Sequence, residues 1–204
     1  MAVTDPTDTK RRPPARERLL AAANQLFDAE GIQTVGVDRI IEQAGVSRGS
    51  FYNNFESKEQ LIHTYLLGHH HSTTTQLTEA VAKQSDPRKK ILAVFDTQAQ
   101  RIRQPDFNGC AFVSATTEAP AGGVIDRDAG EFRTWVRNMF TDLADQAGAP
   151  DPGQLGRQLH VLYDGAGLTA RMDHDPDIAT ATRAGVETLL DTALRPRPRR
   201  PETR

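Results

Sequence analysis

Residues 44–55 read AGVSRGSFYNNF, and this stretch decides the fold of the N-terminal third of the chain. Gly45 can take the left-handed backbone conformation that a tight turn between two helices requires. Ser47 is a favoured N-cap residue, so it predicts a helix from Arg48 to about Phe55. The stretch therefore predicts the turn and the second helix of a helix-turn-helix unit.

The residues on either side complete this unit. Upstream, an apolar stripe at helical spacing predicts a helix that ends at Gly31, and a short helix follows over about 37–44. Downstream, Ser57 and Gln60 form a capping box that predicts the start of a fourth helix. The apolar residues expected to hold the unit together are Leu19, Ala22, Ala23, Leu26, Phe27, Ile40, Ile41, Val46 and Phe51.

The exposed face of the helix that starts at Arg48 suits the major groove of DNA. Arginine can pair bidentately with guanine and asparagine with adenine, while tyrosine can reach a phosphate or a thymine methyl group. The candidate contact residues are Arg48, Gly49, Ser50, Tyr52, Asn53 and Asn54. The same spacing also occurs in an ordinary helix hairpin within a bundle, so the pattern alone leaves both interpretations open.

The rest of the chain is predicted to be helical, without a strand or an internal repeat. Start signals and apolar stripes predict helices over about 87–102, 111–115, 132–143, 154–172 and 178–194. Residues 119–130 are rich in glycine, proline and aspartate and are predicted to form a loop. The predicted fold class is all-α, with an N-terminal three-helix helix-turn-helix domain and a larger C-terminal helical domain.

Composition indicates the domain boundaries. We predict a flexible basic arm over residues 1–14, the helix-turn-helix domain over 15–62, a helical domain over 63–194 and a disordered basic tail over 195–204. Basic residues gather at both ends, whereas the whole chain has a formal net charge of −2. Such ends fit local binding to nucleic acid and are equally typical of solvated tails.

Several classes of protein are disfavoured by the sequence. The single cysteine, Cys110, rules out an intramolecular disulfide and fits a reducing cytoplasm. The chain lacks the apolar stretches of a signal peptide or a membrane span, so we expect a cytoplasmic protein without a membrane partner. It carries no phosphate-binding loop, nucleophile elbow or His-Glu-x-x-His motif, so we expect neither an enzyme nor a cofactor.

Histidines of the predicted fourth helix raise the question of a metal sensor. His69, His70 and His71 would point about 100° apart on a helix, so they cannot all face one ion. His63 shares a face with His70, but no carboxylate or cysteine lies nearby in sequence. We therefore expect solvated or pocket-lining histidines and no metal site. Cys110 is interpreted first as a small core residue and second as a redox-sensing thiol.

Three stretches of the N-terminal region resemble the DNA-binding domain of the TetR family of transcriptional regulators. They are TVGVDRII over 34–41, AGVSRGSFYNNF over 44–55 and SKEQL over 57–61, and the resemblance runs without a gap from about Arg16 to Tyr65. It implies DNA contacts from Thr34, Gly36, Ser47, Arg48, Gly49, Ser50, Tyr52, Asn53, Asn54 and Lys58. Asn54 stands where the family often has histidine, so the preferred DNA sequence is expected to differ.

The resemblance also implies a ligand-responsive repressor that acts as a homodimer on a palindromic operator. The last two helices of each copy would meet as a four-helix bundle, with candidate interface residues Leu155, Leu159, Leu162, Val186 and Leu189. An apolar or aromatic small molecule would bind among the C-terminal helices, with candidate pocket residues Phe95, Cys110, Phe112, Trp135 and Met139. Its binding would shift the fourth helix and release the DNA. Lys10, Arg11 and Arg12 of the arm would add phosphate contacts.

Two alternatives remain open at this point. The chain could be an enzyme or a metal-binding bundle that carries a helix-turn-helix-like hairpin, which predicts turnover or bound metal and DNA binding that ignores sequence. It could also bind DNA as an activator, or as a constitutive repressor without an effector.

Overall fold

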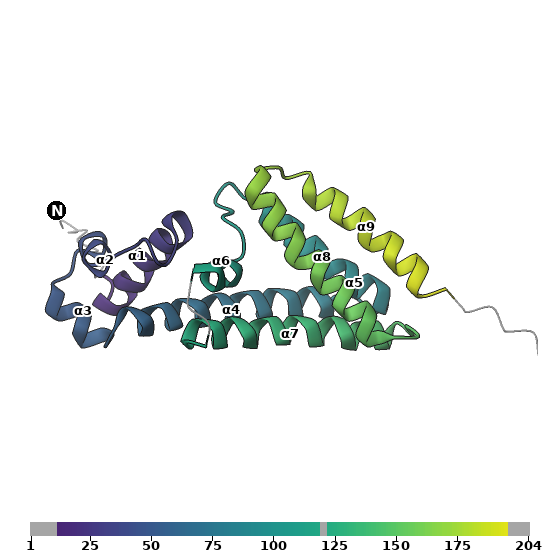
Figure 1. Ribbon diagram of the computed structural model, residues 1–204, viewed down its shortest axis with the longest axis horizontal. Coiled ribbons are helices and arrows are strands. Elements are labelled where there is room, and N and C mark those ends of the chain that lie inside the picture. Colours follow the sequence, from purple (N-terminus) through teal and green to yellow (C-terminus); the bar gives the residue numbers. More distant parts are fainter. Residues whose placement is uncertain (1–11, 119–121, 196–204) are drawn as a thin grey trace, which may run out of the picture. The chain divides into compact units, whose positions relative to one another are not determined.

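A computed structural model of the protein describes residues 12–118 and 122–195, and this described chain contains helices and no strand. The helices are α1 (Ala15–Glu30), α2 (Val37–Ala44), α3 (Arg48–Asn54), α4 (Lys58–Ala82), α5 (Pro87–Ile102), α6 (Ala111–Glu118), α7 (Val124–Gln146), α8 (Pro152–Asp173) and α9 (Ile178–Ala193) (Figure 1). They form two compact units that divide between Tyr65 and Leu66. The predicted all-α fold class is confirmed. Residues 1–11 of the predicted arm and 196–204 of the predicted tail lie outside the described residues.

The first unit is built by the packing of α1 against α2 and α3. Its core consists of apolar residues that the sequence pattern selects, and Leu19, Phe27, Ile40 and Phe51 are each at most 3% exposed. Ile41, which the pattern predicts to face inward, is only half-buried. This core gives the short helices α2 and α3 the tertiary support that helices of such length need in water.

The start of α4 is fastened to α1. Ser57 Oγ accepts a hydrogen bond from the backbone N–H of Gln60 at 3.2 Å, as the predicted capping box requires. The Tyr65 hydroxyl donates to Asp28 Oδ1 at 2.5 Å, and the Tyr65 ring packs edge-on against Phe27. The cap starts α4, and the Tyr65 contacts hold its first two turns against α1.

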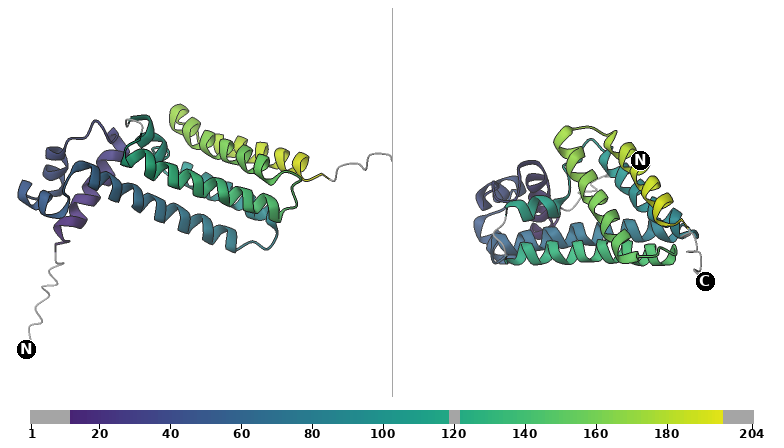
Figure 2. Two further views of the ribbon diagram at one scale, coloured as in Figure 1. Left: turned by 60° about the horizontal axis from the view of Figure 1, so that its bottom comes forward. Right: turned by 45° about the vertical axis from the view of Figure 1, so that its right-hand side comes forward.

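In the second unit, α7 packs along α8, and α9 lies along both α5 and α8 (Figure 2). Gly156 of α8 permits a close approach, because a Cβ atom there would lie 2.9 Å from the backbone nitrogen of Thr141 in α7. Phe95, Phe140 and Tyr163 join α5, α7 and α8, with Phe95 and Phe140 stacked at a centroid distance of 5.5 Å.

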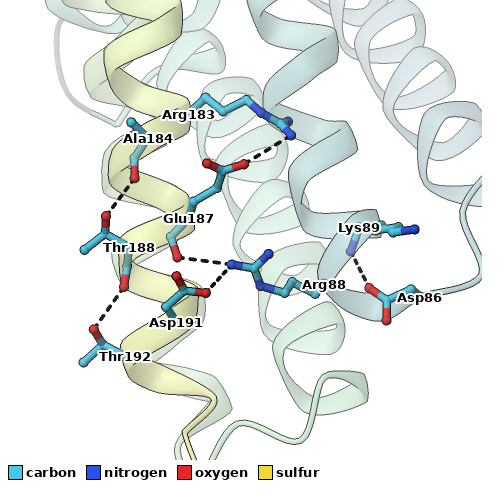
Figure 3. A network of polar contacts seen from close by, with 9 residues as sticks. All are labelled: Asp86, Arg88, Lys89, Arg183, Ala184, Glu187, Thr188, Asp191 and Thr192. Carbon is cyan, nitrogen blue, oxygen red and sulfur yellow. Dashed lines mark hydrogen bonds and ion pairs between the residues drawn. The ribbon is translucent and has the colours of Figure 1, made fainter.

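An apolar seam and a row of polar contacts hold α9 in this unit. The buried residues of the seam are Ala99, Ile102, Ala166, Ala170 and Ala179. Along the edge, Arg88 of α5 contacts Asp191 and the carbonyl of Glu187 (Figure 3), and Arg183 of α9 forms an ion pair with Asp96 of α5. Because partly exposed ion pairs contribute about 0–1 kcal/mol each, the seam is the larger source of stability.

The loop expected over 119–130 is shorter than predicted, because α7 already begins at Val124. Asp126 in its first turn accepts a hydrogen bond from the backbone N–H of Gly122 at 3.0 Å. Ile125 and Ala129 are buried, and their burial outweighs the poor helix propensity of the glycine and aspartate residues around them. Within the described part of the chain, no helix is both long and apolar enough to cross a membrane.

Candidate nucleic-acid interface

The turn between α2 and α3 has the geometry that the sequence predicts. Gly45 has φ 59° and ψ 47°, which is the left-handed conformation, and its N–H donates to the carbonyl of Glu42 at 3.1 Å. Ser47 then caps α3 by accepting a hydrogen bond from the N–H of Ser50 at 3.1 Å. The start and direction of α3 therefore depend on the Gly45 backbone conformation and on hydrogen bonds within a few residues of the turn.

Two arginines hold this turn from the N-terminal side of the chain. Arg18 Nη1 donates to the carbonyls of Ala44 and Gly45, both at 2.8 Å, and Arg12 Nη2 donates to the Gly45 carbonyl at 3.3 Å. Cations at this position also compensate the negative end of the α2 dipole. The sequence pattern predicts phosphate contacts for Arg12 and not this role, because a basic run before a DNA-binding helix is typical of both.

The helix α3 has a buried face and an exposed face. Phe51 is fully buried, whereas its neighbour Tyr52 is 49% exposed. Arg48, Gly49 and Asn53 are also exposed. The exposed face presents a guanidinium, a phenol and an amide, which are groups that contact base edges and phosphates.

Other candidate contact residues are engaged within α3 itself. Asn54 Nδ2 donates to the carbonyl of Ser50 at 2.7 Å, and both residues are half-buried. Ser47 Oγ is the N-cap acceptor described above. In this conformation the amide nitrogen of Asn54 binds a carbonyl in the last turn of α3 and does not point from the exposed face of the helix.

Three further candidates lie at or before helix starts. Thr34 is exposed in the turn before α2. Gly36 is the N-cap residue of that helix and has an extended backbone conformation. Lys58 is the first residue of α4, and its Nζ donates to the carbonyl of Gln33 at 3.4 Å. The N–H groups at a helix start favour phosphate, so these positions suit contacts to a DNA backbone.

Arg48 forms an ion pair with Asp38 of α2, and the Nη1 and Oδ1 atoms lie 3.0 Å apart. The sequence pattern does not predict this pair. The two residues are ten positions apart, on different helices, and only the geometry of the turn brings them together.

Comparison with known proteins places this geometry in a family. The sequence model of the bacterial regulatory proteins of the tetR family matches residues 19–65, which contain the helix-turn-helix. The transcriptional repressor NemR of Escherichia coli K12 is 32% identical over 192 residues, covering 87% of this chain and 94% of NemR. The chain belongs to the TetR family. The crystal structure of a TetR-family regulator from Streptomyces coelicolor has a TM-score of 0.86 at 34% identity, covering 90% of this chain and 91% of that one.

As a TetR-family member, the chain is a DNA-binding transcriptional regulator, which decides against the enzyme interpretation. Within residues 12–118 and 122–195, no group of histidine, cysteine, aspartate or glutamate side chains could hold a metal ion. His70 instead packs edge-on against Phe112 and Phe132, at centroid distances of 6.3 and 5.5 Å.

The candidate effector residues of this TetR-family protein lie in different surroundings. Phe95 and Phe112 are each 3% exposed and stack on other phenylalanines, while Trp135 and Met139 are half-buried on α7. Cys110 lines a pocket of about 200 Å³ between the start of α6 and the end of α8. Burial raises the pKa of the Cys110 thiol, which disfavours the thiolate that a redox sensor needs.

The candidate dimer residues divide into two groups. Leu155, Leu159 and Val186 are at most 2% exposed within the single chain, so we assign them to its core and not to a surface that a second copy could cover. Leu162 and Leu189 are half-buried. The large apolar side chains that α8 exposes are others, namely Val161 at 70%, Leu168 at 45% and Met172 at 69%.

Proposed function

We propose that this TetR-family regulator is a repressor that binds a palindromic operator as a homodimer and releases it when a small molecule binds. The observation that carries the proposal is the exposed face of α3, where Tyr52 stands beside Arg48 and Asn53 while Phe51 anchors the helix in the core. Its relative NemR is named a transcriptional repressor, which supports repression rather than activation.

Helix α8 supplies the main dimer surface in this proposal. Val161, Leu168 and Met172 lie on one stripe, because they occupy helix positions i, i+7 and i+11. A side chain at Gly165, within the same stripe, would meet no atom within 4 Å, so a second helix can approach closely there. Exposed apolar stripes of this kind are typical of protein interfaces. A two-fold dimer would place its recognition helices about 34 Å apart, which is one turn of DNA.

The pocket of about 200 Å³ between α6 and α8 is our candidate effector site. Val113, Leu168 and Met172 supply its apolar lining, and because Leu168 and Met172 also belong to the proposed dimer stripe, this site lies at the edge of that interface. Arg171 donates a hydrogen bond to Ser114 Oγ beside them. The volume is below the roughly 300–1,000 Å³ typical of ligand pockets. We therefore expect a small effector that carries a polar group on an apolar body.

Release of the operator is proposed to run through α4, which begins at Lys58 and ends at Ala82 and so belongs to both units. An effector that favours one position of α4 would change the spacing of the two α3 helices in a dimer. A coupling free energy of about 1–3 kcal/mol would weaken operator binding about 5- to 150-fold.

Selection of bound sequences from a random DNA pool at about 150 mM salt tests the proposal. Wild type should enrich one palindrome, and so should the control Thr134→Ala, which changes an exposed residue of α7. Tyr52→Ala should fail to enrich it. Uniform recovery of all sequences by wild type would leave only electrostatic binding and would contradict the proposed function.

A further inference from the structure

The ion pair between Arg48 and Asp38 joins the first residue of α3 to the first turn of α2. The Asp38 and Arg48 side chains are 77% and 66% exposed. Exposed pairs of this kind contribute little to the free energy of folding. The place of Asp38 in the first turn of α2, where the helix dipole favours a carboxylate, adds only a small stabilisation, so neither effect gives this residue a large part in the stability of the first unit.

A carboxylate beside the exposed face of α3 affects DNA binding in two ways. Its negative charge repels the phosphates of every sequence alike. It also engages part of the Arg48 guanidinium, which carries five N–H donors in a rigid fork. With one nitrogen held by Asp38, the fork is less able to turn towards a phosphate, while its remaining donors can still reach O6 and N7 of a guanine.

We propose that Asp38 is a specificity-determining residue, which orients the Arg48 guanidinium for base recognition and lowers the affinity for DNA of unrelated sequence. This rests on the proposed function, because it assumes that α3 recognises an operator. Asp38 is a positioning residue in this scheme, since it acts through Arg48. Specificity is a difference between two affinities, so a group that weakens unrelated binding more than operator binding increases it.

The first unit offers a matched control for this pair. Arg39 and Glu30 form an ion pair of 2.8 Å, with side chains 58% and 36% exposed. This pair joins α2 to the last residue of α1 and does not involve α3. Glu30→Gln therefore removes the same charge as Asp38→Asn and leaves the Arg48 contact in place.

The experiment compares full-length wild type, Asp38→Asn, Asp38→Glu and Glu30→Gln. For each protein, the dissociation constants for the selected operator and for an unrelated duplex of equal length are measured over a series of salt concentrations. Asp38→Asn should bind the unrelated duplex about five-fold more tightly at about 150 mM salt, with a steeper salt dependence, because the released Arg48 side chain can then bind a phosphate. Its operator affinity should change less, so the ratio of the two affinities falls. Asp38→Glu and Glu30→Gln should keep a ratio near that of wild type.

The outcomes separate this inference from the proposed function. A ratio that Asp38→Asn leaves unchanged, or that Glu30→Gln lowers equally, would overturn the inference alone. A wild-type protein that binds both duplexes equally would contradict the proposed function and the inference with it. If thermal unfolding shows that Asp38→Asn does not fold, Asp38→Ser makes the same comparison, because it also removes the carboxylate and leaves Arg48 unchanged. A retained ratio in that variant would also overturn the inference.

Discussion

Arg18 is a single side chain that meets two carbonyl groups at the end of a helix. Its Nη1 donates to Ala44 and Gly45, and hydrogen bonds from a charged donor contribute about 1.5–3 kcal/mol. We expect Arg18→Met, which retains an apolar stem, to lower the free energy of unfolding by about 2 kcal/mol in urea denaturation. Arg39→Met, the control, removes only an exposed pair with Glu30 and should lower it by less than about 1 kcal/mol. An equal fall in the free energy of unfolding of both variants would contradict the larger contribution assigned to the Arg18 hydrogen bonds.

His160 makes stability depend on pH. Burial lowers its pKa below the ordinary value of 6.5; Asp164 opposes this shift, while Arg133 and Arg137 add to it. Because the folded pKa is the lower one, the unfolded chain takes up the proton first as the pH falls below about 6.5. The contribution of His160 is thus full above that pH and is lost as the pH falls towards the folded pKa.

We therefore expect the melting temperature to fall between about pH 7 and pH 5.5, and His160→Gln to reduce that dependence. Thermal unfolding followed by circular dichroism over this range measures it. His71→Gln, which changes an exposed histidine of α4, should leave the dependence as in wild type. The assignment to His160 fails if both variants behave alike.

Residues that act on their own backbone neighbourhood could be predicted from the sequence. Ser47, Ser57 and Gly45 determine the caps and the turn through hydrogen bonds or dihedral angles within a few positions. The contacts of Arg18 and Asp38 could not be predicted in this way. Each depends on how two helices pack, because the packing decides which residue of the second helix lies next to the side chain. The exposed face of α3 was predictable for the same local reason, since helical periodicity separates Phe51 from Tyr52.

At the scale of elements, the approach of α7 to α8 depends on the absence of one side chain. A Cβ at Gly156 would lie 2.9 Å from the nitrogen and 3.0 Å from the Cα of Thr141, and backbone atoms cannot turn aside as a side-chain tip can. We expect Gly156→Ala to lower the free energy of unfolding by about 1–3 kcal/mol. The cost of the clash with the Thr141 backbone outweighs the advantage of about 1 kcal/mol that alanine has over glycine within a helix.

Gly130→Ala on α7 is the matched control for that prediction. A Cβ there would meet no atom within 4 Å, so helix propensity alone should act and should stabilise the chain by up to about 1 kcal/mol. Chemical denaturation of both variants should therefore give changes of opposite sign. A stabilising Gly156→Ala would mean that the two helices can separate without loss of packing.

Sequence periodicity located most helices but not every boundary. The bounds of α2 agree with the prediction because its apolar residues and the flanking Gly36 and Gly45 give consistent signals. The start of α7 was missed because glycine and aspartate around Val124 favour a loop locally, while burial of Ile125 against other helices favours the helix. That burial is a tertiary effect, which a local pattern does not contain.

For the molecule as a whole, the dimer surface is hard to predict from the sequence because one helix can carry more than one apolar stripe. Leu155 and Leu159 of α8 face the interior of their own chain, whereas Val161 and Met172 of the same helix face solvent. Periodicity finds both stripes, but it does not tell which one packs against the same chain and which one remains for a partner. Leu155 and Leu159, which the family resemblance suggests as dimer residues, lie on the buried stripe, and only burial in the folded chain distinguishes it from the exposed one.

The exposed stripe of α8 leads to a prediction about assembly. Val161 is 70% exposed, so Val161→Glu removes little from the core and should leave the helix content unchanged. In the proposed dimer the new carboxylate would be buried without a partner, and a cost of about 2 kcal/mol would weaken dimerisation about 30-fold. Sedimentation equilibrium measures this change, and operator binding should weaken with it because each half-site contributes to affinity. Leu67→Glu, at a 46% exposed position of α4, is the control and should remain dimeric. A Val161→Glu protein that dimerises like wild type would exclude this stripe as the interface, whereas loss of dimers in both variants would point to a general effect of the added charge.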